Sequence, residues 1–168
     1  MLTQSQLKEC LHYNPETGDF TWLKPLANRM HAGDIAGVKA KSGYIYIKFD
    51  SKRYSGHRLA WFYVYGEFPD CDIDHINLKR CDNRIKNLRK ATRSENLQNT
   101  VLRKDNTSGV KGVSWCSITR RWLARCGVNG VRYQLGRYDS IEGAINAVME
   151  FREEHHGEFA NHGGNHDR

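Results

Sequence analysis

The sequence has no long hydrophobic run, no closely spaced cysteine pair and only 3 prolines in 168 residues. No apolar stretch approaches the roughly 18–20 residues needed to span a bilayer, so we expect no membrane segment. Residues 1–10 lack the charged start and apolar stretch of a secretory signal. Aromatic residues make up 11% of the chain, which argues against complete disorder. These features favour a folded protein of the cytoplasm.

The five cysteines are an odd number, and none of them forms a Cys-x-x-Cys pair. A cysteine-rich zinc site usually shows such close pairs, so we expect no structural zinc. Reduced and mostly buried thiols are typical of a cytosolic protein. A metal held by Cys71 and Cys81 is the less favoured alternative.

Positive charge exceeds negative charge, with 26 Lys and Arg against 19 Asp and Glu and a formal charge of +7. Such a surplus indicates a polyanionic partner, but it does not choose between DNA, RNA and an anionic membrane.

Residues 1–69 form a first, strand-rich segment. Thr3 is a candidate N-cap for a short helix that carries Leu7. Residues 44–49 alternate β-branched and aromatic side chains and predict a strand. Residues 57–65 predict a short apolar helix that ends at Gly66.

Residues 70–99 are polar and rich in asparagine, and 100–108 predict a linker. Beyond it, 109–115, 121–128 and 131–135 predict three strands, because Asn129-Gly130 between alternating runs is a strong hairpin signal. Residues 141–155 predict an amphipathic helix with Ser140 as N-cap. The C-terminal domain of three strands and one helix is therefore expected to span 109–161, and 162–168 to form a polar tail.

The polar middle segment carries the residue types that phosphodiester hydrolysis needs. A neutral histidine can act as the base for water, and His75 is the candidate. Asp carboxylates and Asn carbonyls are hard oxygen ligands that suit Mg²⁺ better than zinc. An Asn carbonyl can also accept from histidine Nδ1–H and leave Nε2 to take a proton. Adjacent Asp74 and His75 can point to opposite sides of a strand end.

This segment resembles the HNH nuclease family, and more closely its phage and intron-encoded branch. The resemblance rests on Asp74-His75, on the run Asp82-Asn83-Arg84-Ile85-Lys86-Asn87-Leu88-Arg89, and on Asn96 in a predicted helix. It implies a ββα-metal fold with His75 as general base and Asn87 as the residue that orients it. Asp74 and Asn96 would hold one Mg²⁺ or Mn²⁺ ion.

Several assignments stay open. Asn99 is a less favoured alternative to Asn96, and Asp72 shares a strand face with Asp74 without belonging to the family pattern. His57 has either a structural hydrogen-bonding role or a role near the phosphate.

Basic residues crowd the same middle segment, and we expect them to contact phosphates. They are Arg80, Arg84, Lys86, Arg89, Lys90 and Arg93. Arg84 and Arg89 belong to the family motif and could instead be structural.

The C-terminal segment resembles the APETALA/ethylene-response-factor DNA-binding domain. The matching stretches include Gly109–Val113, Arg121–Ala124, Leu135–Tyr138 and His156–Asn161. If Trp122, Ala124 and Cys126 face the helix, Leu123 and Arg125 face outward. The resemblance implies groove contacts from one set of residues: Lys111, Ser114, Arg125, Arg132, Gln134 and Arg137. Ser114 and Gln134 depart from the plant domains, so the plant sequence preference does not transfer. Trp115 and Trp122 are expected in the core.

Together these patterns predict an α+β protein with a ββα-metal HNH core, a strand-rich lead-in and a three-stranded antiparallel sheet packed on one helix. The predicted function is site-specific, metal-dependent DNA cleavage of homing type, by a monomer or weak dimer on double-stranded DNA. The protein would be phage-encoded and act in the cytoplasm of a bacterial host. A DNA-binding regulator with an inactive nuclease segment and an RNA-cleaving enzyme are the rival functions.

Overall fold

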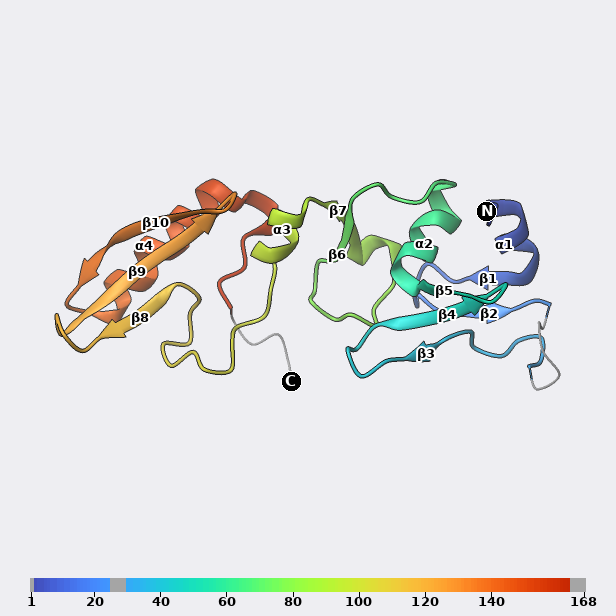
Figure 1. Ribbon diagram of the computed structural model, residues 1–168, viewed down its shortest axis with the longest axis horizontal. Coiled ribbons are helices and arrows are strands. Elements are labelled where there is room, and N and C mark those ends of the chain that lie inside the picture. The colour runs from blue at the N-terminus through green and yellow to red at the C-terminus, as the bar shows by residue number, and fades with distance from the viewer. Residues whose placement is uncertain (1, 25–29, 164–168) are drawn as a thin grey trace. The chain divides into compact units, whose positions relative to one another are not determined.

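The computed structural model describes residues 2–24 and 30–163 and shows a mixed α/β fold built from small sheets and short helices (Figure 1). The chain divides into two compact units, with the border between Lys90 and Ala91. The predicted tail lies outside the described residues from position 164 onward. In the described residues no helix is long and apolar enough to cross a membrane.

The N-terminal unit contains two helices, one 3₁₀ helix and three small sheets among its described residues. Its elements are α1 (Gln4–Cys10), β1 (Leu11–Tyr13), β2 (Phe20–Trp22), β3 (Val38–Lys39), β4 (Ile45–Phe49), β5 (Lys52–Ser55), α2 (Gly56–Tyr65), β6 (Asp72–His75), η1 (Ile85–Asn87) and β7 (Leu88–Ala91), whose last residue falls across the border. The sheets are β1-β2, β3-β4-β5 and β6-β7.

The hydrophobic core of this unit joins its helices to its sheets. Leu7 of α1, Leu11 of β1, Ile47 of β4 and Leu59 of α2 are fully buried in one cluster. The strand expected at 44–49 and the helix expected at 57–65 are both confirmed within one residue at each end. Thr3 caps α1 by accepting from the Gln6 amide, as the capping-box geometry requires.

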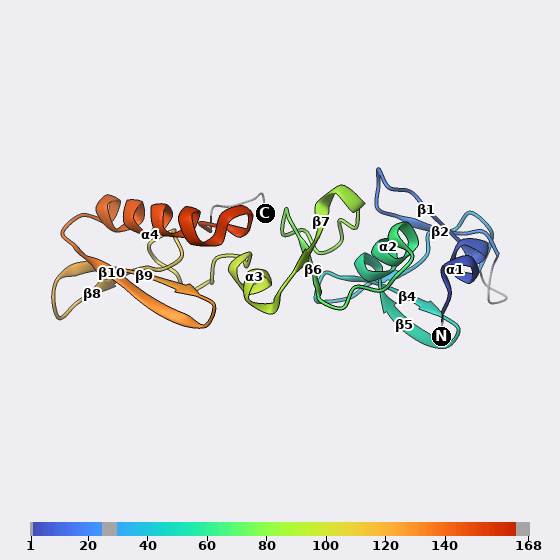
Figure 2. The same cartoon turned by 90° about the horizontal axis from the view of Figure 1, so that it is seen from above.

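The C-terminal unit places one long helix against one face of a three-stranded antiparallel sheet (Figure 2). Its elements are α3 (Arg93–Gln98), β8 (Val113–Cys116), β9 (Arg121–Val128), β10 (Val131–Tyr138), α4 (Ile141–His156) and η2 (Gly157–Phe159). The sheet has the order β10-β9-β8. Val113, Ala124, Ala144 and Val148 form the buried core between sheet and helix.

Local signals in this unit match the structure closely. Ser140 accepts a hydrogen bond from the Gly143 amide at the start of α4. Asn129 and Gly130 both have positive φ, the requirement of a type I′ hairpin turn. The strand expected from Gly109 begins only at Val113, because Gly109 and Gly112 adopt left-handed conformations that interrupt an extended backbone.

Gly112 allows two backbones to approach closely. Its amide group precedes β8, and its carbonyl oxygen accepts from the Arg125 amide at 2.9 Å. A Cβ atom at position 112 would overlap the carbonyl oxygen of Arg125, whereas a Cβ atom at Gly109 would meet only open space.

We therefore expect Gly112→Ala to destabilise the C-terminal unit far more than Gly109→Ala. Both glycines have nearly equal φ, +81° and +77°. The left-handed conformation alone costs a side chain about 1–2 kcal/mol, and the overlap at Gly112 adds about 1–3 kcal/mol. Thermal unfolding of both variants measures the difference. Equal losses of stability would contradict the close approach.

Candidate active site on the β6 strand end

Two adjacent polar residues end β6 in a buried position. Asp74 and His75 are each 4% exposed. Buried polar groups are stable only when hydrogen-bonded, and these two side chains have different neighbours. The expectation that they diverge from the strand end therefore agrees with the structure.

Asp74 is bound by Arg89 of the neighbouring strand β7. The Arg89 Nε and Nη2 atoms lie 3.0 and 2.9 Å from Asp74 Oδ2. Both side chains are largely buried, with 12% and 5% exposure. Arg89 thus orients and neutralises the carboxylate, a structural role that the family motif left open.

His75 lies in a cluster of rings and amides. Its Nε2 atom is 3.3 Å from Asn83 Oδ1, and its ring contacts His57 edge-on at 5.1 Å and Tyr44 at 5.9 Å between centroids. Because an amide oxygen only accepts, Asn83 Oδ1 forms a hydrogen bond with His75 in the tautomer that carries its proton on Nε2. In that tautomer Nδ1 is the unprotonated atom, whereas the sequence analysis assigned the free lone pair to Nε2.

The sequence analysis did not identify Asn83 as a hydrogen-bond partner of His75. It is 2% exposed, and its backbone carbonyl accepts from the Tyr13 hydroxyl at 2.7 Å. Gly18 and Gly56 pack so closely that a Cβ atom at either would press into Asn83. The Asp-Asn-Arg run in the motif was the signal, but the glycines and Tyr13 lie far away in sequence.

Asn87 holds the loop that joins β6 to β7. Its Oδ1 accepts from the Asn77 amide at 3.0 Å, and its Nδ2 donates to the Asp82 carbonyl at 2.9 Å. Arg84 forms a two-pronged ion pair with Asp82 and lowers the pKa of that carboxyl to about 2. An orienting role of Asn87 toward His75 stays a prediction.

Burial keeps both histidines of the cluster neutral. Loss of water around His75 lowers its pKa, while the Asn83 hydrogen bond and the Asp74 charge oppose that shift. Burial lowers the pKa of His57 to about 3, helped by the positive charge of Arg58 and by that of His75 when His75 is protonated. The His57 Nδ1 atom is buried without a hydrogen-bond partner, so this atom offers no support for the structural hydrogen-bonding role, the first of the two predicted for His57.

The two predicted metal ligands belong to different units. Asp74 ends β6 in the N-terminal unit, and Asn96 lies on α3 in the C-terminal unit. A carboxylate and an amide oxygen together form a donor set that suits Mg²⁺ or Mn²⁺. Among the described residues no group of three or more His, Cys, Asp or Glu side chains could hold a metal. Their joint role stays a prediction.

The basic residues of the middle segment differ in their described partners and in their exposure. Arg84 and Arg89 are held by Asp82 and Asp74. Lys86 forms an exposed ion pair with Glu16, and Lys90 lies over the Trp61 ring at 5.8 Å. The remaining two are exposed side chains, Arg80 and Arg93.

Arg80 lies at the edge of the histidine cluster. Its Nη1 donates to the Ser42 carbonyl at 3.0 Å, and its guanidinium lies 5.1 Å from the centroid of the Tyr44 ring. The Tyr44 ring also contacts both His57 and His75. Arg80 is therefore linked to His75 through the ring of Tyr44.

The sheet of the C-terminal unit presents polar residues on the face opposite α4. The predicted facing of β9 is confirmed, because Ala124 and Cys126 are buried while Leu123 and Arg125 alternate with them. We use the term open sheet face for Ser114, Leu123, Arg125, Arg132, Gln134 and Arg137, which the register places together.

A β-bulge brings Arg137 onto the open sheet face. Gln134 pairs with Arg125 and Arg137 with Leu123, so three steps along β10 match two along β9. Leu135 is the extra residue, and Gly136 beside it has φ +142°. Without the bulge Arg137 would point to the opposite face, because side chains alternate along a strand.

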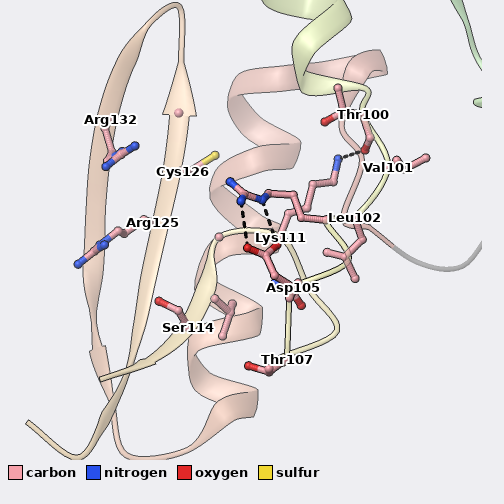
Figure 3. Close-up of a pocket in the computed structure, with 15 residues that line it drawn as sticks. Thr100, Val101, Leu102, Asp105, Thr107, Lys111, Ser114, Arg125, Cys126 and Arg132 are labelled. Atoms are coloured by element: carbon pink, nitrogen blue, oxygen red, sulfur yellow. Dashed lines mark hydrogen bonds and ion pairs between the residues drawn. The ribbon is translucent and has the colours of Figure 1, made fainter. Parts of the chain in front are cut away.

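Lys111, one of the predicted groove contacts, binds backbone carbonyls within its own unit. Its Nζ donates to the carbonyl of Thr100 at 2.5 Å (Figure 3) and to that of Gln98 at 3.1 Å, and the residue is partly buried. Burial lowers its pKa to about 8. Beside it lies a hollow of about 550 Å³, with Ser114, Arg125 and Arg132 among its lining residues.

The aromatic and cysteine expectations are met only in part. Trp122 packs against the core, but Trp115 is 49% exposed and only contacts Trp122 edge-on. The cysteines are free thiols, yet only Cys126 is buried and Cys81 is exposed. The prediction of mostly buried thiols is therefore wrong.

Comparison with known proteins identifies the class of this site. The HNH endonuclease family matches residues 54–98, which include Asp74, His75 and Asn96. This match indicates DNA as substrate and endonuclease activity, and HNH nucleases generally use a divalent metal ion.

Protein 3.8 of Escherichia phage T7 is 32% identical over 105 residues, which are 62% of this chain and 86% of that protein. The chain therefore belongs to the same family as Protein 3.8 and carries an HNH endonuclease domain. No solved structure matches it significantly.

The buried His57 predicts a pH-dependent stability. Its folded-state pKa of about 3 lies below the ordinary value of 6.5, so between these values only the unfolded chain takes up the proton. This site therefore lowers the free energy of unfolding as pH falls below about 6.5, by up to about 1.4 kcal/mol per pH unit.

Replacement His57→Phe removes this titration while His75, Tyr44, Arg58 and Asp72 around it remain. Denaturant unfolding between pH 4 and 7 should show a shallower loss of stability in the variant. Parallel curves for both proteins would show that His57 is not kept neutral by the fold.

Proposed function

We propose that this protein is a divalent-metal-dependent, site-specific DNA endonuclease of homing type with a ββα-metal active site. The observation that carries the proposal is the buried strand end of β6. There, within the matched nuclease domain, an oriented carboxylate and a neutral histidine stand side by side. A structural strand end has no need of two adjacent buried polar side chains, each with its own buried partner.

His75 acts as the general base. Asn83 accepts from Nε2–H, so Nδ1 holds the lone pair that removes a proton from the attacking water. The water oxygen then bonds to phosphorus, the bond to the leaving oxygen breaks, and that oxygen takes up a proton. The low polarity around His75 keeps the base unprotonated at neutral pH.

Asp74 and Asn96 hold one Mg²⁺ or Mn²⁺ ion in this proposal. When bound, the ion stabilises the charge that develops on the phosphate oxygens. Arg89 holds the Asp74 carboxylate in one orientation. Asn87 joins the Asn77 amide to the Asp82 carbonyl and so fixes the β6–β7 loop that carries Asn83.

The open sheet face reads the DNA duplex. Arg, Gln and Ser side chains can contact base edges and phosphates, and a small sheet fits the major groove. The three-stranded sheet on one helix supports a DNA-binding domain of APETALA/ethylene-response-factor type spanning 109–161. Lys111 is set apart from this face because its ammonium binds backbone carbonyls.

Exposed basic residues of the middle segment contact the DNA backbone, with Arg80, Lys86, Lys90 and Arg93 as the candidates. The enzyme acts as a monomer that nicks one strand or as a weak dimer on DNA, in the cytoplasm of a bacterial host. Its relationship to a phage protein supports a phage origin.

The first test is nicking of supercoiled plasmid that carries candidate target sites, in Mg²⁺ and in chelator. We expect metal-dependent nicking by the full chain and a loss of at least about 10²-fold in His75→Ala, the usual share of general-base catalysis. His12→Ala, at an exposed histidine of β1, is the matched control. Full activity in His75→Ala would refute the mechanism, and specific binding without cleavage would favour a regulator.

The second test concerns the open sheet face. Arg125→Ala and Arg132→Ala should each weaken site-specific binding by about 1–3 kcal/mol, which is roughly 5- to 150-fold in Kd. Lys104→Ala removes the same charge from an exposed position outside the sheet and should have little effect. Unchanged footprints in both arginine variants would contradict the assignment of this face.

A further inference from the structure

The helix that carries Asn96 is too short to hold its own orientation. α3 contains 6 residues, with a capping box between Thr92 and Glu95 at its start. Isolated helices of this length are unstable in water. Contacts from outside the helix must therefore fix the direction in which its side chains point.

The start of α3 and the residue that ends it are both bonded to later parts of the C-terminal unit. Ser94 Oγ donates to Asn129 Oδ1 in the β9–β10 turn at 3.3 Å. Asn161 Nδ2 donates to Asn99 Oδ1 at 2.9 Å, and both of these amides are buried. A buried amide that loses its partner is costly, so this pair resists rotation of the helix.

Lys111 closes the C-terminal end of the helix. The Gln98 carbonyl is among the last carbonyls of α3, which lack partners inside the helix. The Lys111 ammonium binds this carbonyl and that of Thr100. A cation at a helix C-terminus also complements the helix dipole.

Lys111 is itself firmly held. Its backbone amide donates to the His162 carbonyl at 3.2 Å, and its carbonyl accepts from Arg152 Nη2 at 3.0 Å. Arg152 is 4% exposed and belongs to α4. A continuous chain of bonds therefore runs from the core helix of the C-terminal unit to the end of α3.

The predicted linker, 100–108, also contacts the residues that hold α3. Thr100 accepts from Lys111, and a Cβ atom at Gly163 would press on Leu102. Residues 100–102 thus lie against the C-terminal unit, and α3 belongs to that unit as a compact body.

We propose that Lys111 and Asn161 are positioning residues of the nuclease, which hold α3 and with it the orientation of the proposed metal ligand Asn96. This proposal rests on the proposed function. It assigns Lys111 a place in the cleavage step and not in DNA contact. Metal binding then depends on the folded state of the DNA-binding unit.

The test uses the full chain with Lys111→Met and Asn161→Ala, and Lys104→Met as control for loss of a lysine charge. Nicking of supercoiled plasmid is measured against Mg²⁺ concentration, and DNA binding is measured without metal. We expect both positioning variants to need about 5- to 30-fold more Mg²⁺ for half-maximal nicking, since loss of one or two such bonds changes an equilibrium by that factor. DNA affinity should stay within about twofold of the wild type, which is less than one lost phosphate contact.

Weaker DNA binding by Lys111→Met with an unchanged Mg²⁺ requirement would overturn the proposal and make Lys111 a phosphate contact. Lys111→Arg, which restores a cation at the carbonyls, should recover much of the wild-type Mg²⁺ requirement. A uniform loss of rate without a change in Mg²⁺ requirement would also overturn the positioning role.

Hydrogen exchange separates this proposal from the proposed function. Amides of 93–99 should exchange faster in Lys111→Met and Asn161→Ala than in wild type and Lys104→Met, whether or not the protein cleaves DNA. Unchanged exchange would show that these residues do not hold α3. If exchange is faster in the variants but the wild type never nicks DNA, Lys111 and Asn161 do hold α3. The nuclease function, and with it their positioning role in cleavage, would then be refuted.

Discussion

The structure of the site depends on the burial of two adjacent polar residues at the end of β6. Asp74 and His75 cannot remain buried unless each has a partner that takes the place of water. Arg89 provides this partner for Asp74 from the neighbouring strand, and Asn83 provides it for His75 from the loop. The loop bonds of Asn87 and the close approach of Gly18 and Gly56 to Asn83 follow from that requirement.

The need of buried polar residues for hydrogen-bond partners also shapes the C-terminal unit. Lys111 and Asn161 are buried or half-buried polar residues that bind α3 and the residues that follow it, and the buried Arg152 holds Lys111 through its carbonyl. A boundary drawn from the sequence separates the nuclease motif from the DNA-binding domain at the linker. The compact units divide earlier, between Lys90 and Ala91, because the hydrogen bonds of α3 reach forward along the chain.

Local patterns predicted the elements well, because their signals lie within a few residues. The capping by Thr3 and Ser140, the helix end at Gly66 and the Asn129-Gly130 turn are examples. Alternation along β9 also predicted which side chains share a face. The bulge at Leu135 was not predicted, since it appears only in the pairing of two strands.

Partners that lie far apart in the sequence were predicted poorly, because no signal within a few residues identifies them. Composition could place Lys111 among basic residues near DNA, but not beside the Gln98 and Thr100 carbonyls. It could assign a neutral histidine to position 75, but not the ring nitrogen that Asn83 binds. Motif order located the site, whereas the partner of each polar group depends on how distant segments fold together.

In the proposed mechanism, Asp74 and Asn96 hold a divalent ion beside the base His75. The decisive experiment is diffraction from crystals of the full chain with target DNA and Mn²⁺, using the anomalous signal of the metal. We expect one Mn²⁺ ion bound by the oxygen atoms of Asp74 and Asn96, with His75 Nδ1 facing the scissile phosphate. An ion bound by other residues, or His75 turned with Nε2 toward the phosphate, would contradict it.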